Sequence, residues 1–282
     1  MLIWICRRLN LVCVVVAACL VGSGVSSEEV SSDVRALLKR TGEFYGNLGG
    51  FHVEVASELR RYYDDKKESK AIVIDMTVKR PELASIRLKD PKTTDLMGWV
   101  VADNECLYEY FAERSGYYVS RRESDIQHAL HLAAQMGSEP ALCASALLDE
   151  VLHNRPFSIR LMQMSRGDDL GVETVNGTSC RHIRCVFPTL SVFVSPIVDL
   201  WIAEGDKPLI VRALLDLTEA DRQFSAKTFT IGPDGQKKPK IPAKQVYSEL
   251  EFRNWTTDVQ SESDAFKFVP PDGAKPLPPL RE

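Results

Sequence analysis

The chain has 282 residues, and its 35 Lys and Arg against 39 Asp and Glu give a net charge of −4. This balance offers no basic face of the kind that nucleic-acid-binding proteins carry, so we expect no nucleic-acid partner. The length allows one large β-rich domain or two small ones, and either can bury a substantial hydrophobic core.

The first 27 residues have the order of an export signal. Arg7 and Arg8 form a basic start, residues 9–20 are an apolar run broken only by Asn10, and small residues follow. This order predicts a secretory signal peptide over residues 1–27, and therefore an exported protein of the periplasm or cell envelope. The alternative, a retained membrane anchor, is disfavoured because a spanning helix needs about 20 apolar residues.

Two ways of processing this segment are open. Residues 16–19 (VAAC) are a permissive match to the bacterial lipobox, in which Cys19 would be lipidated and become the new N-terminus. The competing cleavage lies after Ser27, where Val25 and Ser27 occupy the two positions that a signal peptidase reads. A lipidated chain would associate with a membrane through its N-terminus, whereas cleavage after Ser27 would release a soluble protein.

Hydrophobic periodicity divides the first half of the chain into one helix and a series of strands. Apolar residues at three- and four-residue spacing predict an amphipathic helix over residues 30–48, which Gly49 and Gly50 end. The period then changes to two, which is typical of strands that are wet on one face. We expect these strands to form an antiparallel meander over residues 51–59, 72–78, 83–88, 98–102, 106–111 and 117–121.

The middle of the chain returns to a helical pattern. Residues 125–135 carry apolar side chains at helical spacing, and a second helix begins at Ser138, with Pro140 in its first turn. We therefore expect a two-helix insert at residues 124–153. The apolar face of its second helix includes Leu142, Leu147 and Val151.

Strands dominate the last third of the chain. We expect them over residues 179–187, 194–202, 209–218, 224–231 and 243–255. A basic, Pro-rich loop that begins at Pro233 and contains Lys237, Lys238 and Lys240 predicts a flexible turn, and the tail over residues 276–282 is Pro-rich. The whole pattern predicts a single α+β domain over residues 28–275, mainly antiparallel, with about eleven strands.

Four cysteines follow the signal region: Cys106, Cys143, Cys180 and Cys185. Outside the cytoplasm they can form disulfides, and four cysteines allow three complete pairings. Buried free thiols are an equally good interpretation, because Cys also packs as a small apolar side chain.

The sequence carries no strong catalytic or metal-binding signature. Two pairs come closest: His128 and His131 share a helix face, and Cys180 and His182 share a strand face. Neither pair has an evident third partner that would complete a metal site or a nucleophile. We therefore expect no catalytic residue, no metal site and no cofactor.

A resemblance to a known family rests on short motifs in a fixed order. Residues 199–202 (DLWI) and 207–212 (KPLIVR) resemble the strand-turn-strand of the LolA/LolB-like superfamily of periplasmic lipoprotein carriers. The closing signature of one branch of that superfamily, predicted periplasmic proteins of unknown function, is similar to residues 252–255 (FRNW), 264–268 (DAFKF) and 270–275 (PPDGAK).

The resemblance implies both a fold and a function. The fold would be a strongly curved, incompletely closed antiparallel barrel with helices covering its concave face. In carrier members the concave cavity holds acyl chains, so a hydrophobic ligand such as an acyl chain or a lipoprotein is expected. The expected lining combines the insert with facing aromatic strand residues: Leu142, Leu147, Val151, Trp99, Tyr108 and Trp201.

Two other functions stay open. An envelope protein that interacts with another protein, or a sensor or regulatory domain, would need no small-molecule ligand, and a filled core would favour it. Some relatives in the branch are joined to thioredoxin-like domains, so the resemblance also admits a redox-associated enzyme. The motifs themselves favour a non-catalytic binding protein, either a free carrier or a lipidated acceptor at a membrane.

Overall fold

The computed structural model describes residues 30–121, 126–153, 156–157, 162–190, 193–194, 196–231, 236–260 and 264–278. The predicted signal peptide over residues 1–27 and Cys19 within it lie outside the described residues, as do residues 279–282 of the Pro-rich tail. In the part of the chain that is described, every helix is too short or too polar to span a membrane.

The first half of the chain is a helix followed by a meander of strands. These elements are α2 (Ser32–Asn47), β1 (Gly50–Tyr62), β2 (Lys67–Lys79), β3 (Leu83–Lys89), β4 (Leu96–Ala102), β5 (Cys106–Phe111), a 3-10 turn (Ala112–Arg114) and β6 (Gly116–Arg121). Two helices follow, α3 (Ile126–Met136) and α4 (Glu139–Leu152).

The second half returns to strands, with one further helix. Its elements are β7 (Arg166–Val175), β8 (Thr178–Val186), β9 (Thr189–Leu190), β10 (Phe193–Val194), β11 (Ile197–Ala203), β12 (Ile210–Asp216), α6 (Thr218–Ala226), β13 (Phe229–Ile231), β14 (Lys237–Pro239), β15 (Gln245–Thr256), a 3-10 turn (Asp264–Phe266) and β16 (Lys275–Pro276).

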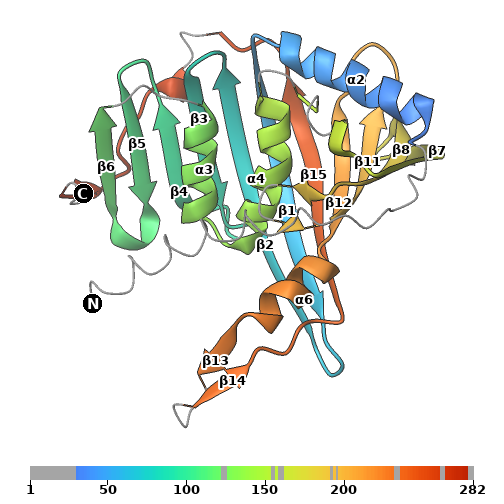
Figure 1. Cartoon of the computed structure of the whole chain (residues 1–282). Helices are drawn as coiled ribbons and strands as arrows, with labels where there is room; N and C mark the ends of the chain where they lie inside the picture. Colours follow the sequence, from blue (N-terminus) through green and yellow to red (C-terminus); the bar gives the residue numbers. More distant parts are fainter. Residues whose placement is uncertain are drawn as a thin grey trace.

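Twelve of the described strands form one curved sheet (Figure 1) in the order β16-β6-β5-β4-β3-β2-β1-β15-β12-β11-β8-β7. Every neighbouring pair is antiparallel except β16 and β6, which run parallel. The two edge strands, β16 and β7, do not pair with each other, so the barrel stays open. The predicted fold class, a mainly antiparallel and incompletely closed barrel, is confirmed, with twelve strands in the sheet where about eleven were expected.

Helices cover the concave face because each strand turns one row of apolar side chains toward it. On β1, Phe51, Val53 and Val55 are fully buried and alternate with half-buried residues. Helix α3 packs on β3, β4 and β5, and α4 packs on β1, β2 and β15. Burying each of these strand side chains contributes about 1.5–3 kcal/mol, so this layer is the main source of stability.

Helix α4 is apolar on nearly every side, which places it inside the fold. Its small residues allow close approach to the sheet, and Leu147, Leu148 and Val151 are buried in the same core cluster as the strands. A helix that is hydrophobic all round is stable only when it is surrounded. The region between α4 and the sheet is therefore filled by side chains of both.

The chain leaves the sheet between β12 and β15, and here the sequence prediction is wrong. Residues 224–231 were expected to form one strand, but residues 218–226 form α6 and only Phe229–Ile231 pairs, with β14. Glu219 and Asp221 in the first turn favour a helix start, and the Asp216 carboxylate accepts the Thr218 N–H at 2.9 Å. The expected flexible turn contains a second short strand, β14.

Candidate functional site

An apolar hollow of about 260 Å³ opens between α4, α6, β1 and β15, and we call it the apolar pocket. Its apolar lining consists of Leu59, Leu142, Cys143, Phe193, Leu217, Ala220, Phe224 and Val246. Leu142 and Phe224 form the mouth, because 36% and 59% of their surfaces are exposed. The other walls belong to the core or to its edge.

Three charged residues, Arg61, Glu139 and Asp221, form a rim on this pocket. The Arg61 guanidinium donates two hydrogen bonds to the Glu139 carboxylate, at 3.0 and 2.9 Å, and Lys70 adds a third at 2.9 Å. Burial by itself would raise the pKa of Glu139, but the hydrogen bonds from Arg61 and Lys70 lower it to about 2. The carboxylate is therefore charged at any physiological pH.

One N–H donor of the Arg61 guanidinium makes no hydrogen bond within the described part of the chain. Its Nε is buried and has no hydrogen-bond partner among the described residues, and the nearest Asp221 oxygen is 3.6 Å away. Asp221 itself accepts the Ala243 N–H at 3.0 Å. A guanidinium held in this way can donate to the polar group of a molecule that lies in the pocket.

The Cys143 thiol in the apolar pocket has low reactivity. Burial raises the pKa of Cys143 to about 12, so it stays protonated and weakly nucleophilic at neutral pH. The four cysteines after the signal region are all free thiols in the structure, with Cys106 half-buried and Cys143, Cys180 and Cys185 buried. Of the two interpretations that the sequence left open, the structure shows free thiols.

The residues predicted to line one cavity lie in three different places. Leu142 lines the apolar pocket, whereas Leu147 and Val151 are buried in the core between α4 and the sheet. Trp99, Tyr108 and Trp201 lie on the opposite, convex face. Of the six residues predicted to line the cavity, one therefore lies in the apolar pocket, two lie in the core and three lie on the convex face.

Strand alternation explains this correction. Gly98 and Val100 face the helices, as the closeness of Gly98 to Met136 of α3 shows, so Trp99 between them faces away. In the same way Leu200 and Ile202 belong to the core, so Trp201 points to the convex face. The expectation that these aromatic residues face the insert is wrong.

On the convex face, Trp99 and Tyr108 bind the chain's own C-terminal segment. The Phe268 ring lies 5.2 Å from the Trp99 ring, stacks at 4.8 Å on Tyr108 and lies 5.1 Å from Tyr117. The Trp99 indole N–H donates to the Ser85 hydroxyl at 3.0 Å. These aromatic rings therefore fix the segment that leads to β16.

Trp201 belongs to a separate cluster on the same convex face. Its ring stacks on His182 at 4.1 Å, and its N–H donates to Glu173 at 2.9 Å. The Arg212 guanidinium lies 4.7 Å from the ring centroid, a cation–π distance. The cluster joins β7, β8, β11 and β12 across the sheet surface.

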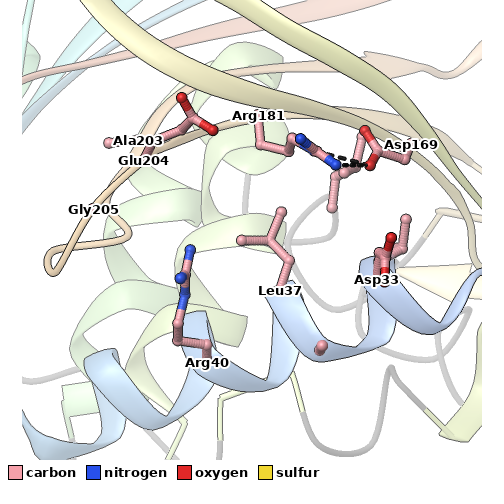
Figure 2. A pocket seen from close by; sticks show the side chains of 11 residues that line it. Asp33, Leu37, Arg40, Asp169, Arg181, Ala203, Glu204 and Gly205 are labelled. Atoms are coloured by element: carbon pink, nitrogen blue, oxygen red, sulfur yellow. Dashed lines mark hydrogen bonds and ion pairs between the residues drawn. The ribbon is translucent and has the colours of Figure 1, made fainter.

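A second hollow, of about 360 Å³, lies under α2 (Figure 2). Leu37 and Arg40 reach it from α2, and Asp169 and Arg181 line it from β7 and β8. Arg181 donates to Asp169 at 2.8 Å. Because its opposite charges already neutralise each other in this way, the hollow is less suited to an acyl chain than the apolar pocket is. Within the described residues, no group of three or more His, Cys, Asp or Glu is placed to hold a metal ion.

The sequence analysis named only Leu142 of the pocket lining, and Arg61, Asp221 and Phe224 are among the residues that it missed. They lie on β1 and α6, about 160 residues apart in the sequence, and they meet because β1 pairs with β15 while α6 packs on β15. A run such as Arg60-Arg61 carries no local signal for a pocket.

No family model and no curated protein matches this sequence. Several solved structures are similar in fold. Lipoprotein LppX of Mycobacterium tuberculosis is 15% identical, with a TM-score of 0.45 over 82% of this chain and 98% of that one. LprF from Mycobacterium bovis is 13% identical, with a TM-score of 0.44 over 83% and 98%. A LolA superfamily protein from Nitrosomonas europaea is 11% identical, with a TM-score of 0.32 over 80% and 94%.

Proposed function

We propose that this chain is an exported cell-envelope protein that binds an amphiphile, such as a lipid or the acyl chain of a lipoprotein, without catalysing a reaction. The observation that carries the proposal is the apolar pocket with its charged rim. The lining side chains offer contact to a hydrocarbon chain, and the rim offers hydrogen bonds to a polar head at the same opening.

The size of the pocket favours a single chain. Ligand pockets commonly have volumes of about 300–1,000 Å³, so a hollow of about 260 Å³ suits one acyl chain better than a large multi-chain lipid. Each buried CH₂ group contributes about 0.8 kcal/mol, which makes burial of the chain sufficient for binding. A catalytic group is not needed for this function.

The rim supplies orientation. The Arg61 guanidinium at the rim favours an anionic head, a carboxylate or a phosphate, which would place the hydrocarbon chain against Leu59 and Val246. The Glu139 and Asp221 carboxylates beside it disfavour a second negative charge by repulsion. We therefore expect an amphiphile with one negative charge to bind more tightly than one with several.

The test is displacement of a fluorescent fatty acid from the purified chain. Leu142→Trp fills the mouth of the pocket and should weaken binding by about tenfold or more, since several buried CH₂ groups lose their contacts. Leu170→Trp, at an exposed position on β7, is the matched control and should bind as the parent does. Absence of saturable displacement, together with a native mass spectrum free of amphiphile, would sink the proposal.

Export and anchoring belong to the same proposal, and the first 27 residues support them. Expression of the full chain in a bacterium, followed by fractionation and intact-mass measurement, should show either cleavage after Ser27 or lipidation at Cys19. A Cys19→Ala variant that moves from the membrane fraction to the soluble fraction identifies a membrane-anchored acceptor. An unchanged, soluble variant identifies a free carrier, and a protein that stays in the cytoplasm contradicts export.

A second candidate function is that of an envelope protein that binds another protein, as a sensor or regulatory domain. The packed core between α4 and the sheet, which buries Leu147 and Val151, favours it. One stable partner in a cross-linking experiment in cells, in the absence of any bound amphiphile, would support this candidate. The raised pKa of the buried thiols gives no support to a redox-associated enzyme.

A further inference from the structure

An arm projects from the end of the sheet where the apolar pocket opens (Figure 1). It consists of the described residues 218–231 and 236–244, which include α6, β13 and β14. The arm is tied to the body where Lys244 N–H donates to the Tyr62 carbonyl at 2.8 Å.

Large apolar side chains are exposed along this arm. Phe224 is 59% exposed, Phe229 is 52% exposed and Ile241 is 78% exposed. An exposed apolar surface of this kind marks an interaction site, because leaving these groups in water costs free energy. Phe224 also lines the apolar pocket, so the exposed surface continues into the mouth.

The same arm is basic in a protein that is acidic overall. Residues 218–244 contain five Lys and one Arg against Glu219, Asp221 and Asp234, a net charge of +3, whereas the chain as a whole has a net charge of −4. The ammonium groups lie next to the exposed rings, since Lys237 Nζ is 4.3 Å from the Phe229 ring centroid and Lys240 Nζ is 5.1 Å from that of Phe224. Apolar and cationic groups thus share one surface.

We propose that this arm docks on an anionic lipid surface. Aromatic and aliphatic side chains enter the headgroup layer while neighbouring lysines contact lipid phosphates, which is the arrangement of interfacial membrane-binding segments. The proposal goes beyond amphiphile binding, because docking does not require an occupied pocket. It also gives the pocket an orientation, with its mouth turned toward the membrane.

The backbone of the arm disfavours a second copy of the chain as the occupant. Strand addition needs a free row of N–H groups at the edge of β14, but Pro239 in that strand has no N–H. Each strand of the β13–β14 pair has only three residues, which is short for an intermolecular sheet. Repulsion between lysines of two arms would further oppose self-association.

The experiment measures co-sedimentation of the purified full chain with vesicles, in a Cys19→Ala background so that N-terminal acylation contributes nothing. We expect binding to vesicles of phosphatidylglycerol and phosphatidylcholine, weak binding to phosphatidylcholine alone, and loss of binding as salt rises. The double variant Phe229→Ser/Ile241→Ser should lower the partition coefficient by about tenfold or more. Lys237→Gln/Lys240→Gln should lower it by about fivefold per lysine.

Matched controls remove similar groups elsewhere on the surface. Val269→Ser changes an apolar side chain that is 68% exposed outside the arm, and Lys92→Gln/Lys275→Gln removes two exposed lysines. Both controls should bind vesicles as the parent does. Thermal unfolding of every variant checks that the body of the protein is intact.

Three outcomes would overturn the proposal: equal binding to neutral and anionic vesicles, arm variants that bind like the controls, or a dimer in analytical ultracentrifugation that the arm variants dissociate while vesicle binding is unchanged. The last outcome would assign the arm to a second copy of the chain. Leu142→Trp separates this proposal from amphiphile binding, because it should lose the fluorescent fatty acid and keep vesicle binding.

Discussion

Tyr45 ties the first helix to the sheet through one buried hydrogen bond. Its ring is fully buried against Trp255, and its hydroxyl accepts the Ile210 N–H at 2.9 Å where β12 begins. Burial raises the pKa of this phenol, because the charged form would lose its hydration. The Trp255 indole in turn donates to the Ile210 carbonyl at 3.1 Å, so both backbone groups of this residue depend on side chains.

Replacing Tyr45 by Phe should therefore destabilise the protein. The substitution leaves the Ile210 N–H buried without a partner, which costs about 1–3 kcal/mol of unfolding free energy. Urea denaturation followed by circular dichroism measures the change. Tyr118→Phe is the control, since its hydroxyl accepts only a 3.3 Å contact from exposed Arg114 and should change stability little. Equal stability of Tyr45→Phe and the parent would contradict this role.

Glu139 makes the stability of the protein depend on pH in a defined window. Its pKa falls from an ordinary value of 4.5 to about 2, although burial alone would raise it, because Arg61 and Lys70 donate to the carboxylate. A lowered folded-state pKa stabilises the protein above the unfolded value, and this contribution is lost as the pH falls from about 4.5 to 2.

Glu139→Gln should accordingly make the free energy of unfolding depend less on pH in the acid range. We expect the variant to be less stable than the parent at pH 6, and the difference between them to shrink steadily below pH 4.5. Denaturant titrations at several pH values measure this convergence. Exposed Glu105→Gln is the control, and parallel curves for parent and Glu139→Gln would show that the ion pair contributes nothing.

At the scale of an element, α2 depends on a residue that helices usually disfavour. Gly42 packs so closely on the backbone that a Cβ there would lie 2.3 Å from the Pro156 carbonyl oxygen. In a free helix, Gly→Ala stabilises by up to about 1 kcal/mol. Here we expect Gly42→Ala to lower the melting temperature instead, because α2 must move away from the chain that follows α4.

A second glycine provides the comparison. Gly49 follows the same helix, and the nearest atom to a Cβ there is the flexible end of Lys79 at 3.9 Å. Gly49→Ala should leave the melting temperature within about one degree of the parent or raise it slightly, as expected for a compatible site. If Gly42→Ala and Gly49→Ala have the same melting temperature, the contact between Gly42 and Pro156 does not exclude a Cβ.

The elements differ in how far the sequence predicted them. Strands β1 and β2 were predictable because each buries one row of alternating apolar residues, and α2, α3 and α4 show helical spacing. The arm was not, because the residues that α6 buries, Asp221 and Ser225, are polar, and β13 and β14 have only three residues each. Trp99 and Trp201 were assigned to the wrong face, although the phase of their strands already opposed it: Val100 and Leu200 beside them take the core positions.

The candidate site was the least predictable part, for a reason that belongs to the whole molecule. Only Leu142 of the expected lining reaches the apolar pocket, because the pocket forms where α4, α6, β1 and β15 converge. That convergence depends on pairing between strands far apart in the sequence, and local periodicity contains no information about it. The charged rim of Arg61, Glu139 and Asp221 arises from the same convergence.

The strand pairing at the centre of the sheet also limits the order in which the sheet can fold. Strand β1 pairs with β15, so His52 lies opposite Thr256. Folding that depends on such distant contacts is slow, because a long loop must close first. A chain threaded through a membrane channel from its N-terminus therefore cannot finish its sheet until nearly all of it has emerged.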